Sequence, residues 1–438
     1  MFKKKWKKEL LLGSMMSIAL FGATAAQSVH PIRCNTYEID QARRAQNPKL
    51  GSTDDFEKWM REALVKRRNN PENYKINATR VIPTVVHVIY SNAGENISTA
   101  MVQSQIDILN EDFQRLNPDT IDTPVGFRSV AADCDVEFCL AQIDPNGTPT
   151  TGIDRISLTG SPFTTGYVDG TIKPSTIWDP SQYFNIWVAN ISGGVLGWAQ
   201  FPEAGSLAGI GTGNGGANTD GVVLLYTSVG RAPANPFGGP YNAGRTATHE
   251  VGHWLGLRHI WGDGGCGVDD FCGDTPESDG SNFGCPTSHS SCGTTDMVHN
   301  YMDYTDDACM NIYTQDQKSR IDVVLGSSIR RASLLTSGVC NLTPEISFVN
   351  AIGTEIEASS SGTSGCRGYT DISIPLRIGG PPIGDATVTM NVVSQTLTPN
   401  VDYQVLVNNI VFPNGITGNQ NFRLRIFDDA SVEGAENI

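Results

Sequence analysis

One eleven-residue window contains three of the chain's seven histidines and constrains the fold more than any other feature. The window reads HEVGHWLGLRH and runs from His249 to His259. On a helix, His249 and His253 lie four residues apart and share one face, so both rings can reach one metal ion. Gly256 permits a backbone turn that other residues resist, which lets His259 approach as a third ligand. The pattern therefore predicts a zinc site.

Glu250 adds a catalytic group to this predicted zinc site. Three neutral histidine nitrogens leave a fourth position on zinc for water, and the metal lowers the pKa of that water to ~7. Glu250 stands beside the first ligand, so it can accept the water proton and later deliver it to a leaving amine. A core helix with solvated histidines is the alternative interpretation, which the added Gly256 and His259 disfavour.

The first residues have the three parts of a secretory signal peptide. A lysine-rich start precedes an apolar stretch from Leu10 to about Ala23, and a small-residue cleavage pattern follows. The stretch is shorter than the ~20 residues that a membrane-spanning helix needs. Residues 1–26 are therefore expected to be a signal peptide, and the protein is expected to be secreted without a membrane span.

Charge and cysteine content agree with export. The chain carries 46 acidic and 31 basic residues, which argues against a nucleic-acid partner because nucleic-acid binders need basic patches. Its ten cysteines favour disulfides in an exported protein. Eight of them lie between Cys134 and Cys340, whereas Cys34 and Cys366 stand apart. The even set in the middle suggests a self-contained disulfide-bonded domain.

Composition divides the remaining chain into three predicted parts. Residues 27–80 are polar and hold one convincing helix after Ser52-Thr53, which is typical of a propeptide, although a folded N-terminal arm is an alternative. In residues 81–342 a strand-helix-strand order followed by helices predicts a mixed α/β (α+β) enzyme domain. Residues 343–438 have short alternating segments, which predict an antiparallel all-β sandwich of the immunoglobulin type.

The expected elements of the middle part follow from β-branched runs, caps and helical spacing. Strands are expected at Val81–Tyr90, Val136–Ala141, Phe184–Ala189 and Gly221–Leu225. Helices are expected after Ser98, from near Arg245 and after Thr314.

The zinc pattern and its continuation, HEVGHWLGLRHIWGD, resemble the zinc motif of the pappalysin family of metzincin metallopeptidases. Downstream, the stretch from Asn300 to Tyr304 resembles the Met-turn of that family. The resemblance implies a metzincin-type protease fold, with Met302 as an apolar floor beneath the metal and Tyr304 as a group that stabilises the oxyanion. Without this resemblance, both side chains would be interpreted as core residues.

The stretch from Asp270 to Pro276 resembles the calcium-binding loop of the same family. The resemblance implies that Asp270, Thr275 and backbone carbonyls bind Ca²⁺, a hard cation that prefers oxygen ligands. A capped acidic turn is the alternative. The resemblance also implies two disulfides, Cys266–Cys292 and Cys285–Cys309. The pairing of the other cysteines near or beyond this domain stays open: Cys134, Cys139, Cys272, Cys340 and Cys366.

Cys34 lies in the predicted propeptide and has a chemical role available. Its thiolate could occupy the fourth zinc position and exclude water, as the cysteine switch does in related latent enzymes. An unpaired or intermolecularly bonded cysteine is the alternative.

Asp306 and Asp307 follow the Met-turn resemblance, where family members shape the S1′ pocket. A carboxylate there would favour Arg or Lys on the carboxyl side of the cleaved bond, through a charge-assisted pair. Either aspartate could instead be a solvated charge.

The C-terminal part resembles a Calx-beta domain. The matching residues are Asp402-Tyr403, the stretch from Val411 to Gly415, and the acidic residues Asp428, Asp429, Glu433 and Glu436. The match stops before the last strand of that family, so the sandwich is expected to be incomplete or the chain truncated.

Together these features predict a secreted zinc-dependent metalloendopeptidase, made as a latent zymogen and acting as a monomer on protein and peptide substrates. One alternative is an inactive adhesion or binding protein with a structural zinc on the same scaffold. Glu250 argues against it, because a structural site needs neither a base nor a free coordination position. The other is a metal-dependent hydrolase of carbohydrates or esters, which would lack the Met-turn.

Overall fold

The computed structural model describes residues 32–69, 79–203, 216–340, 346–349, 362–364, 367–378, 385–393, 397–413 and 418–428. Several features of the sequence lie outside these described residues. They are the predicted signal peptide, Cys366, and the Calx-beta matches Asn414, Gly415, Asp429, Glu433 and Glu436.

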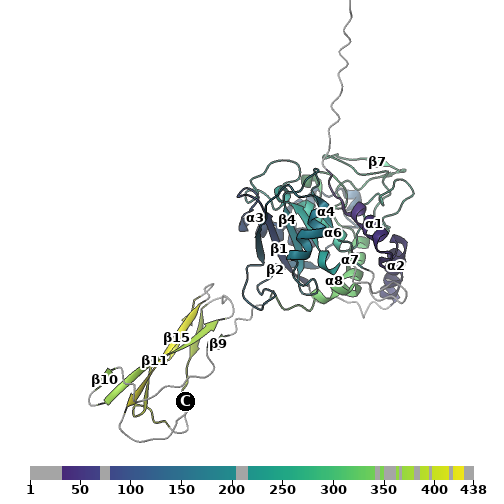
Figure 1. Cartoon of the computed structure of the whole chain (residues 1–438). Helices are drawn as coiled ribbons and strands as arrows, with labels where there is room; N and C mark the ends of the chain where they lie inside the picture. The colour runs from purple at the N-terminus through teal and green to yellow at the C-terminus, as the bar shows by residue number, and fades with distance from the viewer. Residues whose placement is uncertain are drawn as a thin grey trace, which may run out of the picture. The chain divides into compact units, whose positions relative to one another are not determined.

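A six-stranded sheet forms the centre of the middle part of the chain (Figure 1). Its order is β2-β1-β4-β6-β5, and β3 pairs with the second half of β1. All the strands run parallel except β5, which pairs antiparallel with β6 at one edge. The strands are β1 (Arg80–Tyr90), β2 (Val136–Leu140), β3 (Ile153–Ser157), β4 (Phe184–Ala189), β5 (Gly197–Ala199) and β6 (Val222–Leu225).

Every strand that the sequence predicts for this sheet forms, and two more join it. The unpredicted strands, β3 and β5, have five and three residues, too few for a clear alternation of apolar and polar side chains. A further short hairpin, β7 (Ser290–Ser291) with β8 (Thr294–Thr295), lies between the histidine window and the predicted Met-turn.

The helices start where their caps predict. Ser98 accepts a hydrogen bond from the backbone N–H of Met101 at the start of α3, and Thr314 forms a capping box with Gln317 at the start of α7. The histidine helix α6 packs against α3, β5 and β6. The helices of this part are α3 (Thr99–Phe113), α4 (Thr165–Tyr167), α5 (Lys173–Thr176), α6 (Arg245–Trp254), α7 (Gln315–Ser327) and α8 (Ile329–Leu334).

Two helices precede the sheet, α1 (Thr36–Gln46) and α2 (Thr53–Asn69). The expectation of one helix here is wrong because α1 buries Thr36 and Asp40 rather than an apolar stripe, so its sequence lacks helical periodicity. By contrast, α2 inserts Phe56, Trp59 and Met60 into the main core and packs against α7 (Figure 1). The N-terminal segment is thus integrated with the middle part of the chain.

Three disulfides join described cysteines: Cys139–Cys340, Cys266–Cys292 and Cys285–Cys309. The last two are the pairs that the family resemblance implies. Cys134 and Cys272, whose pairing the sequence leaves open, are buried free thiols. Cys134 instead packs in the main apolar core.

The C-terminal part is rich in strands, as predicted. One sheet has the order β10-β11-β15-β13 with β9 beside β11, and β12 pairs with β14. Apolar side chains from both sheets, among them Leu376, Phe412 and Phe422, pack in one cluster. An immunoglobulin-like sandwich of the Calx-beta type stays a prediction. The strands are β9 (Ile346–Phe348), β10 (Gly362–Ser364), β11 (Arg367–Ile378), β12 (Ala386–Thr389), β13 (Tyr403–Val407), β14 (Asn409–Phe412) and β15 (Asn419–Asp428).

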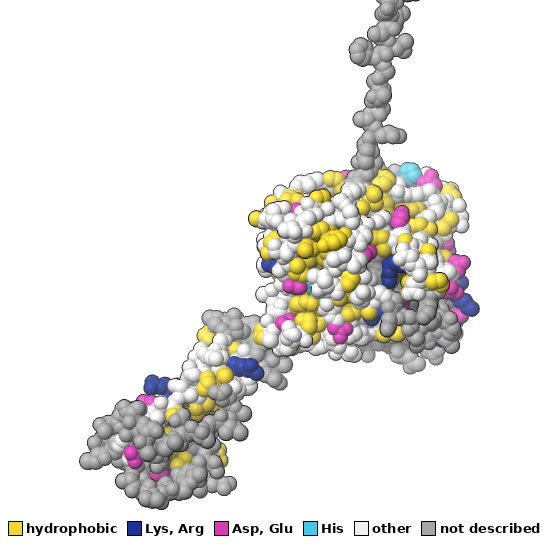
Figure 2. Space-filling view, viewed as in Figure 1, with side chains coloured by type: hydrophobic (Ala, Val, Ile, Leu, Met, Phe, Trp, Pro, Cys, Tyr) yellow, Lys and Arg dark blue, Asp and Glu magenta, His cyan; other side chains and the backbone are white. Residues whose placement is uncertain are grey.

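No helix within the described ranges is both long and apolar enough to cross a membrane. On the face drawn in Figure 2, the described Lys and Arg side chains lie singly or in small groups. That face therefore offers no broad basic patch among its described residues.

Candidate active site

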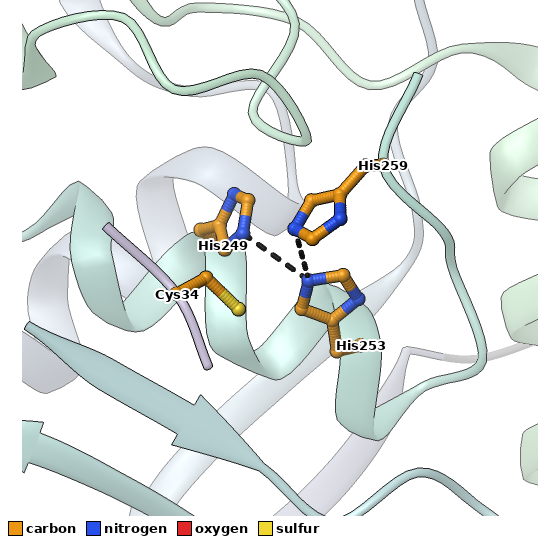
Figure 3. A group of neighbouring side chains, drawn as sticks. All are labelled: Cys34, His249, His253 and His259. Carbon is orange, nitrogen blue, oxygen red and sulfur yellow. Dashed lines mark hydrogen bonds between the residues drawn. The ribbon is translucent and has the colours of Figure 1, made fainter. Parts of the chain in front are cut away.

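Helix α6 carries the first two histidines and Glu250, and all ten of its residues are buried. It ends before Gly256, whose φ of 89° is a left-handed conformation that glycine adopts without strain. The chain reverses at this point, so the ring of His259 turns back toward the helix (Figure 3). The local fold therefore brings the three histidines of the window together.

The three histidine rings meet through their Nε2 atoms. Nε2 of His253 lies 3.2 Å from Nε2 of His249 and 3.0 Å from Nε2 of His259 (Figure 3). Burial and the two neighbouring histidines lower the pKa of His249 well below its ordinary value, and burial together with His259 lowers that of His253 to about 3. The first two rings are therefore neutral at physiological pH.

The other nitrogen of each ring has its own acceptor. Nδ1 of His249 donates to the carbonyl oxygen of Tyr301 at 2.7 Å, and Nδ1 of His253 donates to that of Leu257 at 2.8 Å. Nδ1 of His259 pairs with the carboxylate of Asp263.

A neutral imidazole ring has a single N–H. In His249 and His253 the acceptors place this N–H at Nδ1, so Nε2 has a free lone pair that points toward the other histidines. A cation between them removes the repulsion, and three imidazole nitrogens suit zinc. The residues present therefore fit a zinc ion.

Glu250 is fully buried beside this group of nitrogens. Its Oε2 accepts hydrogen bonds from Oγ1 of Thr36 at 2.8 Å and from Sγ of Cys34 at 3.3 Å. Burial raises the pKa of Glu250 to about 8. Gly197 of β5 lies directly against it, since a Cβ there would be 2.9 Å from Cγ of Glu250. The carboxyl group is thus held between the sheet edge and the N-terminal segment.

Cys34 is the fourth member of the histidine group. Its Sγ and one ring nitrogen of each histidine all lie within 4.8 Å of one another, and Figure 3 shows the sulfur on the open side of the three rings. Burial and the charge of Glu250 raise the pKa of the Cys34 thiol.

The segment that carries Cys34 follows the edge of the sheet at β5. The N–H of Ile32 donates to the carbonyl of Gly194 at 3.0 Å, and the N–H of Asn35 donates to that of Gly197 at 3.1 Å. Between them, the N–H of Leu196 donates to the carbonyl of Ile32 at 3.0 Å. The segment therefore occupies an edge where an extended peptide could add as a strand.

Met302 and Tyr304 lie next to the histidines. Met302 is fully buried beneath α6, because a Cβ on Gly252 would meet its Sδ at 2.4 Å. The ring of Tyr304 is centred 4.9 Å from that of His259, and its hydroxyl donates to the backbone carbonyl of Cys34 at 3.4 Å. Burial raises the pKa of Tyr304, so the phenol keeps its proton.

The two aspartates after Tyr304 have different environments. Asp307 is buried, and its Oδ2 accepts hydrogen bonds from the N–H groups of Ala243 at 3.0 Å and Arg245 at 3.1 Å, at the start of α6. Its Oδ1 lies 2.9 Å from Nη2 of Arg33. Asp306 is only partly buried. The guanidinium of Arg33 also lies 4.5 Å from the ring centre of Tyr241, so Asp307 and Tyr241 both contact this arginine.

The structure also brings Asp270 and Thr275 together. Oγ1 of Thr275 lies 2.9 and 2.7 Å from the two carboxylate oxygens of Asp270 and 2.7 Å from the carbonyl oxygen of Cys272. Burial raises the pKa of Asp270 to about 7.

Four residues near the centre escaped the sequence analysis: Arg33, Thr36, Tyr241 and Asp263. Asp263 had a signal, because it follows His259 by four residues and ligating histidines commonly donate to a carboxylate. The sequence signal for Arg33 was weaker, because it consisted only of its position next to Cys34. Thr36 and Tyr241 had none, since only the folded chain brings them to the site.

Comparisons with known proteins identify the family. The family described as "Pregnancy-associated plasma protein-A" matches residues 166–326. An extracellular metalloprotease of Trichophyton verrucosum is 31% identical over 272 residues, which cover 61% of this chain and 85% of that protein. The chain belongs to this family, the pappalysins. Extracellular metalloprotease 1 of Coccidioides posadasii is 32% identical, with 55% of this chain and 75% of the relative covered.

Solved structures place this pappalysin among the metzincin zinc metalloendopeptidases. Mature mirolysin of Tannerella forsythia, in complex with a cleaved peptide, is 41% identical with a TM-score of 0.55, and the match covers 61% of this chain and all of that one. A promirolysin mutant of the same organism is 37% identical with a TM-score of 0.56, covering 69% of this chain and 97% of that one. The mixed α/β domain is therefore a metzincin-type protease domain.

Asp263→Asn should weaken zinc binding by about 10- to 100-fold, because the neutral amide no longer fixes the tautomer and orientation of His259 as a carboxylate does. Competition with a chromogenic zinc chelator measures the affinity. Asp107→Asn, on the exposed face of α3, is the control and should bind zinc like the unchanged chain. Equal affinities of the two variants would contradict the role of Asp263.

Proposed function

We propose that this pappalysin is an extracellular endopeptidase, made in a latent form, which hydrolyses peptide bonds of protein substrates with zinc at His249, His253 and His259. The observation that carries the proposal is the convergence of three histidine Nε2 atoms beside the buried carboxyl group of Glu250. The extracellular location rests on the names of the relatives from Trichophyton verrucosum and Coccidioides posadasii.

Each side chain around the histidines has a different role in the proposed hydrolysis. Zinc, when bound, supplies the Lewis acidity that polarises a peptide carbonyl and lowers the pKa of water. Glu250 accepts the proton of the attacking water and delivers it to the leaving amine. Tyr304 keeps its phenolic proton and donates a hydrogen bond to the developing oxyanion. Met302 supports the histidines from below, and the edge of β5 binds the substrate as an added strand.

Glu250→Ala should lower the rate of cleavage by about 100- to 10,000-fold, because the proton transfers lose their base. Activated protein is incubated with an unfolded protein substrate, with and without a zinc chelator, and the products are separated by electrophoresis. Zinc content should be unchanged in the variant. Cleavage that persists in the chelator, or full activity of Glu250→Ala, would contradict the zinc mechanism. No cleavage by the activated, unchanged chain would favour an inactive adhesion protein with structural zinc.

We infer that residues 27–80 are a propeptide and that Cys34 keeps the enzyme latent. Three contacts support this inference. The sulfur of Cys34 joins the histidine group, Thr36 donates to Glu250, and the carbonyl of Cys34 accepts from Tyr304. The match to promirolysin also covers 69% of this chain, against 61% for mature mirolysin. The segment thus contacts the metal site, the base and the oxyanion donor at once.

Cys34→Ala should show cleavage activity before any processing, because water can then reach the fourth position on zinc. The measurement is the initial rate on a quenched fluorescent peptide, with intact chain verified by electrophoresis at the same time points. Cys134→Ala removes another buried thiol and should stay latent. A Cys34→Ala chain as latent as Cys134→Ala would exclude the cysteine switch.

We propose that the enzyme prefers Arg or Lys at P1′ and that Asp307 rather than Asp306 sets this preference. Asp307 uses one oxygen to cap α6 and directs the other at the guanidinium of Arg33, which lies against the ring of Tyr241. An arginine side chain of a substrate can make the same contacts once Arg33 has left.

Asp307→Asn should reduce kcat/KM for peptides with Arg at P1′ by about 30-fold or more, because a buried charge pair is lost. The amide oxygen can still cap α6, so peptides with Leu at P1′ should be affected much less. Asp306→Asn is the matched control and should keep the preference. Cleavage-site profiles dominated by apolar P1′ residues in the unchanged enzyme would refute basic specificity.

We also propose that Asp270 and Thr275 bind calcium. Oγ1 of Thr275 lies within 2.9 Å of both carboxylate oxygens of Asp270 and of the carbonyl oxygen of Cys272, which gathers oxygen atoms of the kind that calcium prefers. A calcium-selective chelator should lower the unfolding temperature while zinc is retained. An unchanged unfolding temperature would leave the capped turn as the better interpretation.

A further inference from the structure

Glu57 on α2 is a buried carboxylate whose partners lie far away in the sequence. Its side chain is only 1% exposed. Oε1 accepts hydrogen bonds from Nε of Arg258 at 2.8 Å and from Nη2 of Arg320 at 2.9 Å, and Oε2 accepts from Nη1 of Arg320 at 2.8 Å. Two-point contact between a guanidinium and a carboxylate is among the strongest polar interactions in proteins.

The two arginines are held in place by groups outside α2. Arg320 donates from Nε and Nη2 to the backbone carbonyl of Gly256, at 3.3 and 2.9 Å. The guanidinium of Arg258 lies 5.1 Å from the ring centre of Phe201 and 5.9 Å from that of Phe271. Because these contacts do not involve Glu57, the two guanidinium groups form a site that is already shaped for a ligand.

The charges in this site do not balance. Two guanidinium groups share one carboxylate, and Nη2 of Arg258 is buried without a hydrogen-bond partner among the described residues. The neighbouring carboxylates are engaged elsewhere, since Asp270 contacts Thr275 and Asp263 contacts His259. Burial favours the neutral form of Glu57, but both arginines outweigh it and keep its pKa below the ordinary value. Without Glu57, neither buried guanidinium group would have a carboxylate in hydrogen-bond contact among the described residues, which is costly.

We propose that Arg258 and Arg320 form a carboxylate-binding site in the protease domain, which Glu57 fills as an internal ligand. The idea that Glu57 thereby holds the propeptide rests on the proposed latency. Arg258 directly precedes His259, and Arg320 holds the carbonyl of the turn at Gly256. The site thus anchors α2 to the segment that delivers the third histidine, separately from the contact of Cys34.

The test asks whether acetate restores the unfolding temperature that Glu57→Ala lowers. All proteins are full-length and also carry Glu250→Ala, which prevents self-cleavage. Unfolding is followed by tryptophan fluorescence. All seven tryptophans lie at or before Trp261 and none lies in the C-terminal part, so the signal does not report on unfolding of that part. Glu57→Ala should lower the unfolding temperature by about 5 °C or more. Acetate at 100 mM should then raise it by about 3 °C over chloride of equal ionic strength.

Glu62→Ala is the matched control, since Glu62 is exposed on the same helix. Its unfolding temperature should stay within about 1 °C of the parent and should not respond specifically to acetate. Equal acetate effects in the two variants, or an unfolding temperature of Glu57→Ala equal to that of the parent, would overturn the proposal. The measurement needs no peptidase activity, so failure of the proposed function would leave it interpretable.

Glu57→Gln provides a second variant if Glu57→Ala does not fold. The amide fills the same space without the charge, so it should lower the unfolding temperature and acetate should not restore it. An unfolding temperature equal to that of the parent would overturn the proposal as well.

Discussion

The rest of the site depends on the forced proximity of three imidazole nitrogens. The contacts at 3.0 and 3.2 Å would be repulsive between lone pairs, and the fold maintains them through acceptors on the far side of each ring. One acceptor is the carbonyl of Tyr301, which belongs to the Met-turn rather than to α6. The segment that carries Met302 therefore does more than lie beneath α6, because its Tyr301 carbonyl also fixes which nitrogen of His249 faces the other two histidines.

The N-terminal segment uses the same chemistry that a substrate would use. Arg33 pairs with Asp307, Cys34 lies beside the three histidines, and Thr36 donates a hydrogen bond to the carboxyl group of Glu250. These groups are nearly consecutive, and the backbone between them pairs with the edge of β5. In the proposed latent form, one short segment would therefore contact several functional groups at once, and α2 would add contacts from a separate surface.

Much of this arrangement could be predicted from the sequence, and the failures have identifiable causes. The starts of α3 and α7 follow from their caps, and the histidines follow from spacing within α6 and the glycine after it. Helix α1 was not predicted, because it buries polar side chains and its sequence therefore lacks a periodic apolar pattern. Thr36 and Tyr241 reach the site only through tertiary contacts. Asp306 and Asp307 could not be separated in sequence, since only the folded chain shows which one meets the start of α6.

The disulfide between Cys139 and Cys340 has a mechanical consequence. It joins β2, which lies beside β1 in the central sheet, to the last residue described before the C-terminal part. A force that pulls on the C-terminal part would reach Cys340 first and pass through the covalent bond into β2. The force would then act on a hydrogen-bonded sheet. It would not act on α7 and α8, which without the disulfide could unfold one turn at a time. The disulfide would therefore shield α7 and α8 from a pull on the C-terminal part.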